Sequence, residues 1–282
     1  MNSLNTPDAT KVALIQNCAT ADVDANMQRL DELVAEAAGS GATVIALPEA
    51  FAFIGPDKLK RAMLESLDAD GTATPILDQC RSWARQYECH LLLGGFHERV
   101  PGEPPAANTQ VHLLPDGSIA ARYRKIHLFD VDLADGTRLA ESNNTQPGSK
   151  MVLSQCPFGT LGLTICYDIR FPALYQRLAA AGAMAITVPA AFTQTTGAAH
   201  WHTLLRARAI ETQCFILAAA QHGAHNSRRS SYGHSLIIDP WGETLAEGPA
   251  AADAVITATI DPARVGQIRA QMPCQQHHRP FD

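Results

Sequence analysis

The chain has 282 residues, of which 46% are hydrophobic and 18% are charged, and its formal net charge is −6. This balance is typical of a globular protein with a large core, and the acidic charge argues against a general role on nucleic acid or membrane surfaces. No run of apolar residues is long enough to predict a membrane-spanning helix, and segment 1–10 lacks the apolar core of a signal peptide. The seven cysteines stand singly, which fits neither a disulfide framework nor a zinc site and indicates a reducing cytoplasm.

In the first half of the chain, apolar runs alternate with segments of helical periodicity. We expect strands at 12–16, 43–47, 90–94, 109–114 and 119–125, and helices at 22–38 and 74–87. Pro115-Asp116-Gly117 predicts a hairpin turn between the last two of these strands. Residues 129–149 are polar and rich in Gly, Asp and Asn, which predicts a long loop of the kind that is often functional.

The second half repeats this alternation. We expect strands at 161–165, 184–188, 215–220, 236–239, 244–246 and 255–260, and helices at 173–181, 201–213 and 262–271. Strands alternate with helices at both ends of the chain and hairpins interrupt in the middle, which favours an α/β fold with mixed sheets. Because the strands look buried on both faces, two sheets stacked face to face with helices outside would cover them. Length alone would allow about two domains, although α/β enzymes of this size are often one.

Three side chains of different chemistry follow apolar strands, namely Glu49, Lys125 and Cys166. Taken singly, the two charged residues read as exposed groups and the cysteine as an inert buried thiol. At a strand-to-helix junction, however, Cys166 would lie near backbone N–H groups that favour a thiolate and can bind an oxyanion. Together the three residues supply a nucleophile, a base and a cation for an oxyanion, as acyl transfer from an amide requires.

The segments around these residues are Leu47-Pro48-Glu49-Ala50-Phe51, Tyr123-Arg124-Lys125-Ile126-His127-Leu128-Phe129, and Cys166-Tyr167-Asp168-Ile169-Arg170-Phe171-Pro172. In this order and spacing they resemble the nitrilase (carbon–nitrogen hydrolase) superfamily, and the resemblance extends from about residue 12 to residue 280. It implies a four-layer αββα sandwich with two stacked mixed sheets, and a single domain over 1–282 with 1–10 as a polar extension. It also implies assembly as a homodimer or larger homo-oligomer.

The resemblance implies a role for each residue of the site. Glu49 would act as general base and then general acid, Cys166 as nucleophile and Lys125 as oxyanion stabiliser, with the backbone N–H of Tyr167 as second oxyanion donor. Glu141 falls where the family often has a further carboxylate, and we carry it over as a positioning residue. The chemistry needs no cofactor and no metal.

Within the superfamily, segments 189–193, 196–201, 205–214 and 231–235 resemble the branch of deaminated glutathione amidases. The predicted reaction is hydrolysis of deaminated glutathione to α-ketoglutarate and cysteinylglycine, a metabolite repair. The ω-amidases, which act on α-ketoglutaramate, share the catalytic motifs, and N-carbamoyl amino acid amidohydrolases use the same three residues on a urea-like group. A non-catalytic family member is the remaining class.

Several residues are candidates for binding the substrate. Arg170 lies four residues after Cys166 and would either approach a substrate carboxylate or pair with Asp168 or Glu211. Residues expected to line or bond the substrate are Phe192, Thr193, Thr195 and Thr196. A further hypothesis is that Arg228 and Arg229 bind the glycine carboxylate at the far end of deaminated glutathione.

Pairs of histidines also raise the question of a metal. His200 and His202 stand at the start of an expected helix, and His277 and His278 are adjacent near the end of the chain. A His-x-His pair on a helix points its two rings in different directions, so we expect no metal there. The expected partner is a small-molecule amide, without nucleic acid or membrane.

Overall fold

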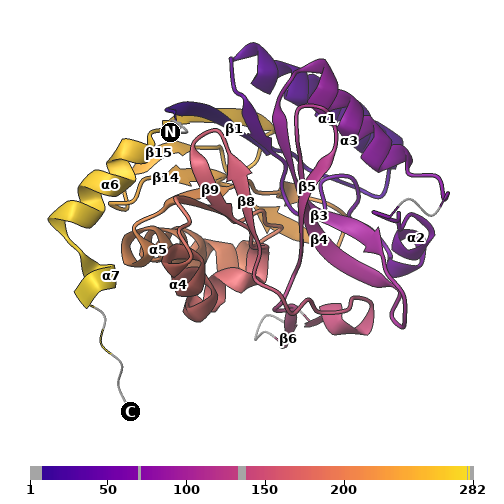
Figure 1. Ribbon diagram of the computed structural model, residues 1–282. Coiled ribbons are helices and arrows are strands. Elements are labelled where there is room, and N and C mark those ends of the chain that lie inside the picture. Colours follow the sequence, from indigo (N-terminus) through magenta and orange to yellow (C-terminus); the bar gives the residue numbers. More distant parts are fainter. Residues whose placement is uncertain (1–7, 69–70, 133–137, 278, 280–282) are drawn as a thin grey trace.

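The computed structural model describes residues 8–68, 71–132, 138–277 and 279. Two six-stranded mixed sheets lie face to face, and helices cover their outer faces (Figure 1). This arrangement confirms the expected αββα sandwich. Segments 1–7 and 280–282, and the candidate His278, lie outside the described residues.

The first sheet takes its strands from both ends of the chain. Its order is β16 (Ala254–Ile260), β1 (Thr10–Gln16), β2 (Val44–Ala46), β3 (His90–Arg99), β4 (Ala106–Leu113) and β5 (Ile119–Arg124). The central pairs β1–β2 and β2–β3 are parallel, and the flanking pairs are antiparallel. Helix α1 (Val23–Gly39) connects β1 to β2, and α2 (Asp57–Ala62) and α3 (Pro75–Gln86) lie between β2 and β3.

The second sheet repeats this plan. Its order is β15 (Thr244–Glu247), β14 (Leu236–Ile238), β11 (Phe215–Ala218), β10 (Ala185–Thr187), β9 (Gly159–Gly162) and β8 (Leu153–Cys156). Helices α4 (Pro172–Ala180) and α5 (Gln194–Thr212) connect its parallel strands β9, β10 and β11. The remaining elements are the hairpins β6 (Asp130–Asp132) with β7 (Arg138–Ala140) and β12 (His222–Ala224) with β13 (Ser230–Tyr232), the 3₁₀ turns η1 (Glu141–Asn143) and η2 (Cys166–Arg170), and the helices α6 (Pro262–Gln271) and α7 (Cys274–His277).

The apolar runs of the strands are explained by burial on both faces. In β1, Val12 and Leu14 pack in the core that includes the second sheet, whereas Ala13 and Ile15 pack with the residues of α1 and α3. Successive side chains of a strand point to opposite faces, so a strand that is covered on both faces reads as a continuous apolar run. Fully burying one such Leu or Ile side chain stabilises the fold by about 1.5–3 kcal/mol.

Several single elements differ from expectation. Helix α5 begins at Gln194 rather than 201, because its first two turns are small and polar and carry no apolar periodicity. Strand β9 ends at Gly162 rather than 165, since its pairing with β8 and β10 stops at Gly162. The expected loop at 129–149 contains β6, β7 and η1. Helix α2, strand β8 and the hairpin β12–β13 were not expected, because each is too short for a periodic pattern.

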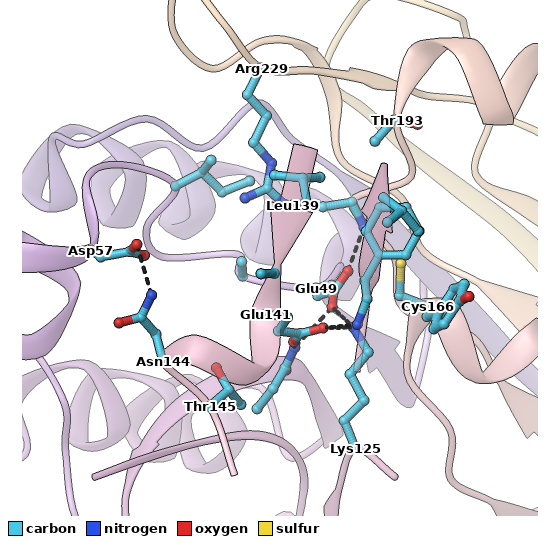
Figure 2. Close-up of a pocket in the computed structure, with 18 of the residues that line it drawn as sticks. Glu49, Asp57, Lys125, Leu139, Glu141, Asn144, Thr145, Cys166, Thr193 and Arg229 are labelled. Atoms are coloured by element: carbon cyan, nitrogen blue, oxygen red, sulfur yellow. Dashed lines mark hydrogen bonds and ion pairs between the residues drawn. The ribbon is translucent and has the colours of Figure 1, made fainter. Parts of the chain in front are cut away.

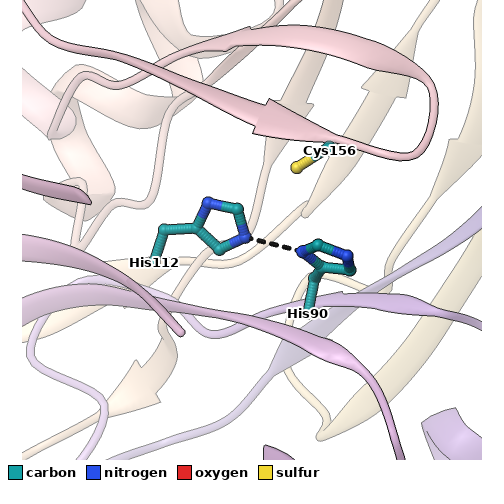
Figure 3. A group of neighbouring side chains, drawn as sticks. All are labelled: His90, His112 and Cys156. Carbon is teal, nitrogen blue, oxygen red and sulfur yellow. Dashed lines mark hydrogen bonds between the residues drawn. The ribbon is translucent and has the colours of Figure 1, made fainter. Parts of the chain in front are cut away.

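A cluster of polar side chains lies between the two sheets (Figure 3). His90 Nδ1 of β3 is 2.9 Å from His112 Nε2 of β4, and His112 Nδ1 is 2.7 Å from Ser154 Oγ of β8. The Cys156 thiol lies beside the rings, and burial raises its pKa to about 12. Because the imidazoles are hydrogen-bonded in a chain and the thiol stays protonated, this cluster serves to satisfy buried polar groups where the sheets meet.

In the part of the chain that the structure describes, no helix combines the length and the apolar character needed to cross a bilayer.

Candidate active site

The three expected reactive residues come together from different sheets. Glu49 follows β2 and Lys125 follows β5 in the first sheet, while Cys166 follows β9 in the second. Strands β2 and β5 run in the same direction, so their carboxyl ends meet at one edge of the sheet. The stacking of the sheets then places Cys166 beside the other two residues at one cavity (Figure 2).

Two glycines allow the approach of Glu49 to the rest of the site. Gly94 and Gly95 form a bulge in β3, where the register with β4 shifts between Leu93 and Phe96. A Cβ on Gly94 would clash with Leu47 O, and one on Gly95 would lie 2.7 Å from Glu49 Cγ. Gly95 also has φ of +64°, which other residues rarely adopt. The bulge therefore makes room for the Glu49 side chain.

Glu49 is buried and its carboxylate is fully hydrogen-bonded. Lys125 Nζ donates to Oε1 at 3.0 Å, Asn108 Nδ2 donates to the same oxygen at 2.9 Å, and Ala191 N donates to Oε2 at 2.9 Å. Burial alone would raise the pKa of Glu49, but Lys125, Cys166 and the Ala191 N–H outweigh it and lower the pKa to about 2. Glu49 is therefore ionised in the free site.

Glu141 holds the other side of Lys125. Its Oε2 accepts hydrogen bonds from Lys125 Nζ at 2.8 Å and from Phe129 N at 2.8 Å, and its Oε1 accepts one from Asn108 Nδ2 at 3.0 Å. Burial would lower the pKa of Lys125, but Glu141 and Glu49 raise it well above its usual value. The ammonium is thus charged between two carboxylates, and the cluster carries one net negative charge.

Cys166 occupies a strained turn. Its φ is +46°, in the left-handed region, and its backbone N–H donates to Pro189 O at 2.9 Å. Burial and the charge of Glu49, with which the thiol is hydrogen-bonded, raise the pKa of Cys166 well above its usual value. The sequence position favoured a thiolate near helix N–H groups. The free site instead holds a neutral thiol, because burial and the adjacent charge of Glu49 disfavour the thiolate.

Asp168 fixes the turn that carries Cys166. It is fully buried, and its carboxylate accepts hydrogen bonds from Ile165 N at 2.9 Å, Tyr123 OH at 2.7 Å and His127 Nδ1 at 2.7 Å. Tyr123 and His127 flank Lys125 in the chain, so one buried carboxylate aligns the Lys125 segment with the Cys166 segment. Sequence reasoning gave Asp168 no role in the chemistry and missed Asn108, although Asp168 lies inside the motif of Cys166.

The cavity has a volume of about 720 Å³. The expected site residues that line it are Glu49, Lys125, Glu141, Cys166, Tyr167, Phe192, Thr193, Thr196 and Arg229. Thr193 and Thr196 are hydrogen-bonded to each other through their hydroxyls at 2.8 Å. Figure 2 shows Arg229 entering the pocket from the side opposite Lys125.

Three expected substrate residues are not in the lining. The guanidinium of Arg170 lies 5.2 Å from the centre of the Phe192 ring, and its Nη1 is 3.3 Å from His200 Nδ1. Thr195 and Arg228 are exposed. Arg170 thus pairs with neither Asp168 nor Glu211, since Asp168 binds the residues named above and Glu211 pairs with Arg208.

The histidine pair of α5 is split as expected. His200 faces Arg170, while His202 Nε2 is 3.0 Å from a Glu247 carboxylate that His234 Nδ1 also approaches, at 2.7 Å. The rings of His200 and His202 therefore point to different partners.

Comparison with known proteins places the chain in a family. The family model for carbon–nitrogen hydrolases matches residues 11–270, and the chain belongs to that family. The chain is 44% identical over 268 residues to the deaminated glutathione amidase of Synechocystis sp. (strain PCC 6803 / GT-S), covering 94% of this chain and 96% of that protein. It is 43% identical over 276 residues to the deaminated glutathione amidase of Homo sapiens, covering 95% of this chain and 82% of that protein.

A solved structure shows the same fold. The NitFhit protein of C. elegans superposes with a TM-score of 0.87 at 37% identity, over 96% of this chain. The chain spans 65% of the length of that protein.

Proposed function

We propose that this protein is an amidase that hydrolyses deaminated glutathione to α-ketoglutarate and cysteinylglycine. The observation that carries the proposal is the buried cluster of Glu49, Lys125 and Glu141 beside the Cys166 thiol, at the wall of a large cavity. The names of the relatives at 43–44% identity support the choice of substrate. The size of the cavity also favours a peptide-like amide over a small one.

The first half-reaction forms a thioester. Cys166 Sγ attacks the amide carbonyl carbon while its proton moves to Glu49, and the negative charge passes to the carbonyl oxygen. Lys125 and the Tyr167 N–H stabilise that oxyanion. The proton transfer accompanies the attack, because burial disfavours a free thiolate at Cys166. The protonated Glu49 then gives its proton to the leaving nitrogen, the C–N bond breaks and cysteinylglycine departs.

The second half-reaction releases the acid. Glu49 takes a proton from water, the hydroxyl oxygen attacks the thioester carbon, and Lys125 and Tyr167 again hold the oxyanion. When this intermediate collapses, the C–S bond breaks and Cys166 recovers the proton from Glu49. Because Glu49 is neutral twice in the cycle, Glu141 serves as the positioning residue that keeps Lys125 charged throughout.

The test is product formation by the purified protein. Deaminated glutathione and α-ketoglutaramate are supplied separately, and α-ketoglutarate is quantified by chromatography. We expect a much higher kcat/KM for deaminated glutathione, with all activity lost in Cys166→Ala. A preference for α-ketoglutaramate would make the protein an ω-amidase. Activity on neither, with carbon dioxide and ammonia released from N-carbamoyl amino acids, would make it a carbamoylase, and activity on no amide would favour a non-catalytic role.

We also propose that the protein works as a homo-oligomer in the cytoplasm. Three apolar side chains from α5 and the β14–β15 hairpin are exposed, namely Ile210, Trp241 and Leu245. Exposed apolar groups of this kind are typical of surfaces that bind another chain. Light scattering of wild type and of Trp241→Glu tests the assembly, and a smaller particle in the variant is the expected result.

A further inference from the structure

The cavity extends beyond the residues used in the chemistry. Lys60 from α2, His97 from β3 and Arg229 from the turn between β12 and β13 also line it. The charge of Lys60 acts on His97 and is itself influenced by Glu141 and Arg229, so these groups lie near one another. They form a second polar region of the same pocket.

The carboxylates of the pocket are already engaged. Glu49 and Glu141 both hold Lys125, Asp132 pairs with Arg138 at 2.8 Å, and Asp57 Oδ2 accepts a hydrogen bond from Asn144 at 2.9 Å. Figure 2 shows the contact of Asp57 with Asn144 and the contacts of Glu49 and Glu141 with Lys125 at separate places in the pocket. No one of these carboxylates forms an ion pair with Lys60 or Arg229 among the residues that the structure describes.

Lys60 and Arg229 are therefore cations without a counterion in the described parts of the chain. Arg229 Nε is buried and has no hydrogen-bond partner there. Burial lowers the pKa of Lys60. The negative charges of Glu141 and Asp57 raise this pKa, and the positive charges of Arg229 and Lys125 lower it further. A carboxylate bound between the two cations would supply the missing acceptor and restore the charge balance.

His97 adds an acceptor to this region. Its Nε2 is 3.1 Å from Phe53 O, and because a carbonyl only accepts, Nε2 carries the proton. Burial and Lys60 lower the pKa of His97 to about 3, so the ring is neutral and Nδ1 holds a lone pair. Nδ1 is buried and has no hydrogen-bond partner among the described residues. It is suited to accept an N–H of a bound ligand.

We propose that Lys60, Arg229 and His97 form a distal subsite that binds the terminal carboxylate and the peptide N–H of a peptide-like leaving group. The proposal rests on the amidase function above and names what distinguishes its substrate from small amides. The leaving group has two residues beyond the scissile bond, and an extended chain of two residues spans at most about 7 Å. Its terminal carboxylate therefore lies away from Cys166, on the far side of the pocket. Of the two arginines expected to bind this carboxylate, the subsite uses Arg229, because Arg228 is exposed outside the pocket.

The test compares three substrates: deaminated glutathione, its C-terminal amide, and α-ketoglutaramate. The variants are Lys60→Gln and Arg229→Gln, with Lys58→Gln and Arg228→Gln as matched controls from the exposed neighbours of the same segments. Losing one charge-assisted hydrogen bond corresponds to about a ten- to hundredfold rise in KM, with kcat little changed. We expect this rise for deaminated glutathione in the first two variants only. Unchanged kinetics on α-ketoglutaramate shows that these variants are folded.

The outcomes separate the subsite from the function. If wild type hydrolyses deaminated glutathione but treats its C-terminal amide equally well, or if both test variants keep the wild-type KM, the subsite is wrong and the function stands. If wild type does not hydrolyse deaminated glutathione, the function fails. The subsite is then judged by calorimetric binding of cysteinylglycine and its amide to Cys166→Ala, where equal affinity would overturn it.

Discussion

Replacing Glu141 with Gln tests whether this residue keeps Lys125 charged. Glu141→Gln preserves size and removes the charge. The Gln oxygen can still accept from Lys125 Nζ and Phe129 N, but its NH₂ group then faces the donor Asn108 Nδ2, 3.0 Å from Oε1 in the wild type. Asn108 cannot turn over to relieve this, because the same Nδ2 donates to Glu49.

The size of the effect follows from the state in which Glu49 has taken a proton. Lys125 is buried, and Glu141 is then the carboxylate that balances its charge. A hydrogen bond to a charged group contributes about 1.5–3 kcal/mol, which corresponds to a loss in kcat of about ten- to hundredfold. Because the interaction strengthens when Glu49 is neutral, KM should change much less than kcat.

The assay is steady-state kcat and KM on deaminated glutathione, with a single-turnover measurement of acid release. The matched control is Asp57→Asn, which removes an exposed carboxylate that lines the same pocket and contacts Asn144. We expect it to retain wild-type kcat. The reasoning is refuted if Glu141→Gln keeps a kcat within about threefold of wild type while Glu49→Gln is inactive.

Three further predictions concern the bulge, the thiol and acid stability. Gly95→Ala should lower the free energy of unfolding by about 1–3 kcal/mol, because its Cβ would meet Glu49 Cγ at 2.7 Å and its φ is +64°. Gly39→Ala, with no atom within 4 Å of the added Cβ, should not be destabilising in urea titrations, and equal stability of the two variants would contradict the close approach. Cys166 should react with iodoethanol much more slowly than the exposed Cys274 at pH 7, and in Glu49→Gln its alkylation profile should move to lower pH, because Glu49 raises the pKa of the thiol. Peptide mass spectrometry gives both rates, and an unmoved profile would exclude that role of Glu49. Burial depresses the pKa of several histidines, to about 3 in His97 and about 4 in His112 and His225. Their stabilisation is fully present above the unfolded pKa of about 6.5 and is lost as pH falls toward these values, by up to about 1.4 kcal/mol per pH unit for each histidine. Urea titrations that give the same stability at pH 6.5 and pH 5 would show that these rings are not buried in the neutral form.

The sequence determined most of the elements and the identity of the reactive residues. Local patterns suffice for this, because the apolar run of β1 and the periodicity of α1 each lie within one segment of the chain. The three motifs also sufficed to name the family, since motif identity and order do not depend on distances. Weak local patterns failed, as in the polar first turns of α5 and the short hairpin β6–β7.

Only the tertiary structure decided how the reactive groups are charged and what surrounds them. Asn108, Lys60 and His97 carry no local signal, because their significance depends on residues distant in the chain that fold against them. Asp168 lies inside the motif of Cys166, but its partners Tyr123 and His127 come from the other sheet's motif. The protonated state of Cys166 likewise follows from burial beside Glu49, which comes from the other sheet. Adjacent Arg228 and Arg229 are equivalent in the sequence, yet one is exposed and the other lines the pocket. Charge, burial and orientation depend on distances in space, and for these residues folding alone sets the distances.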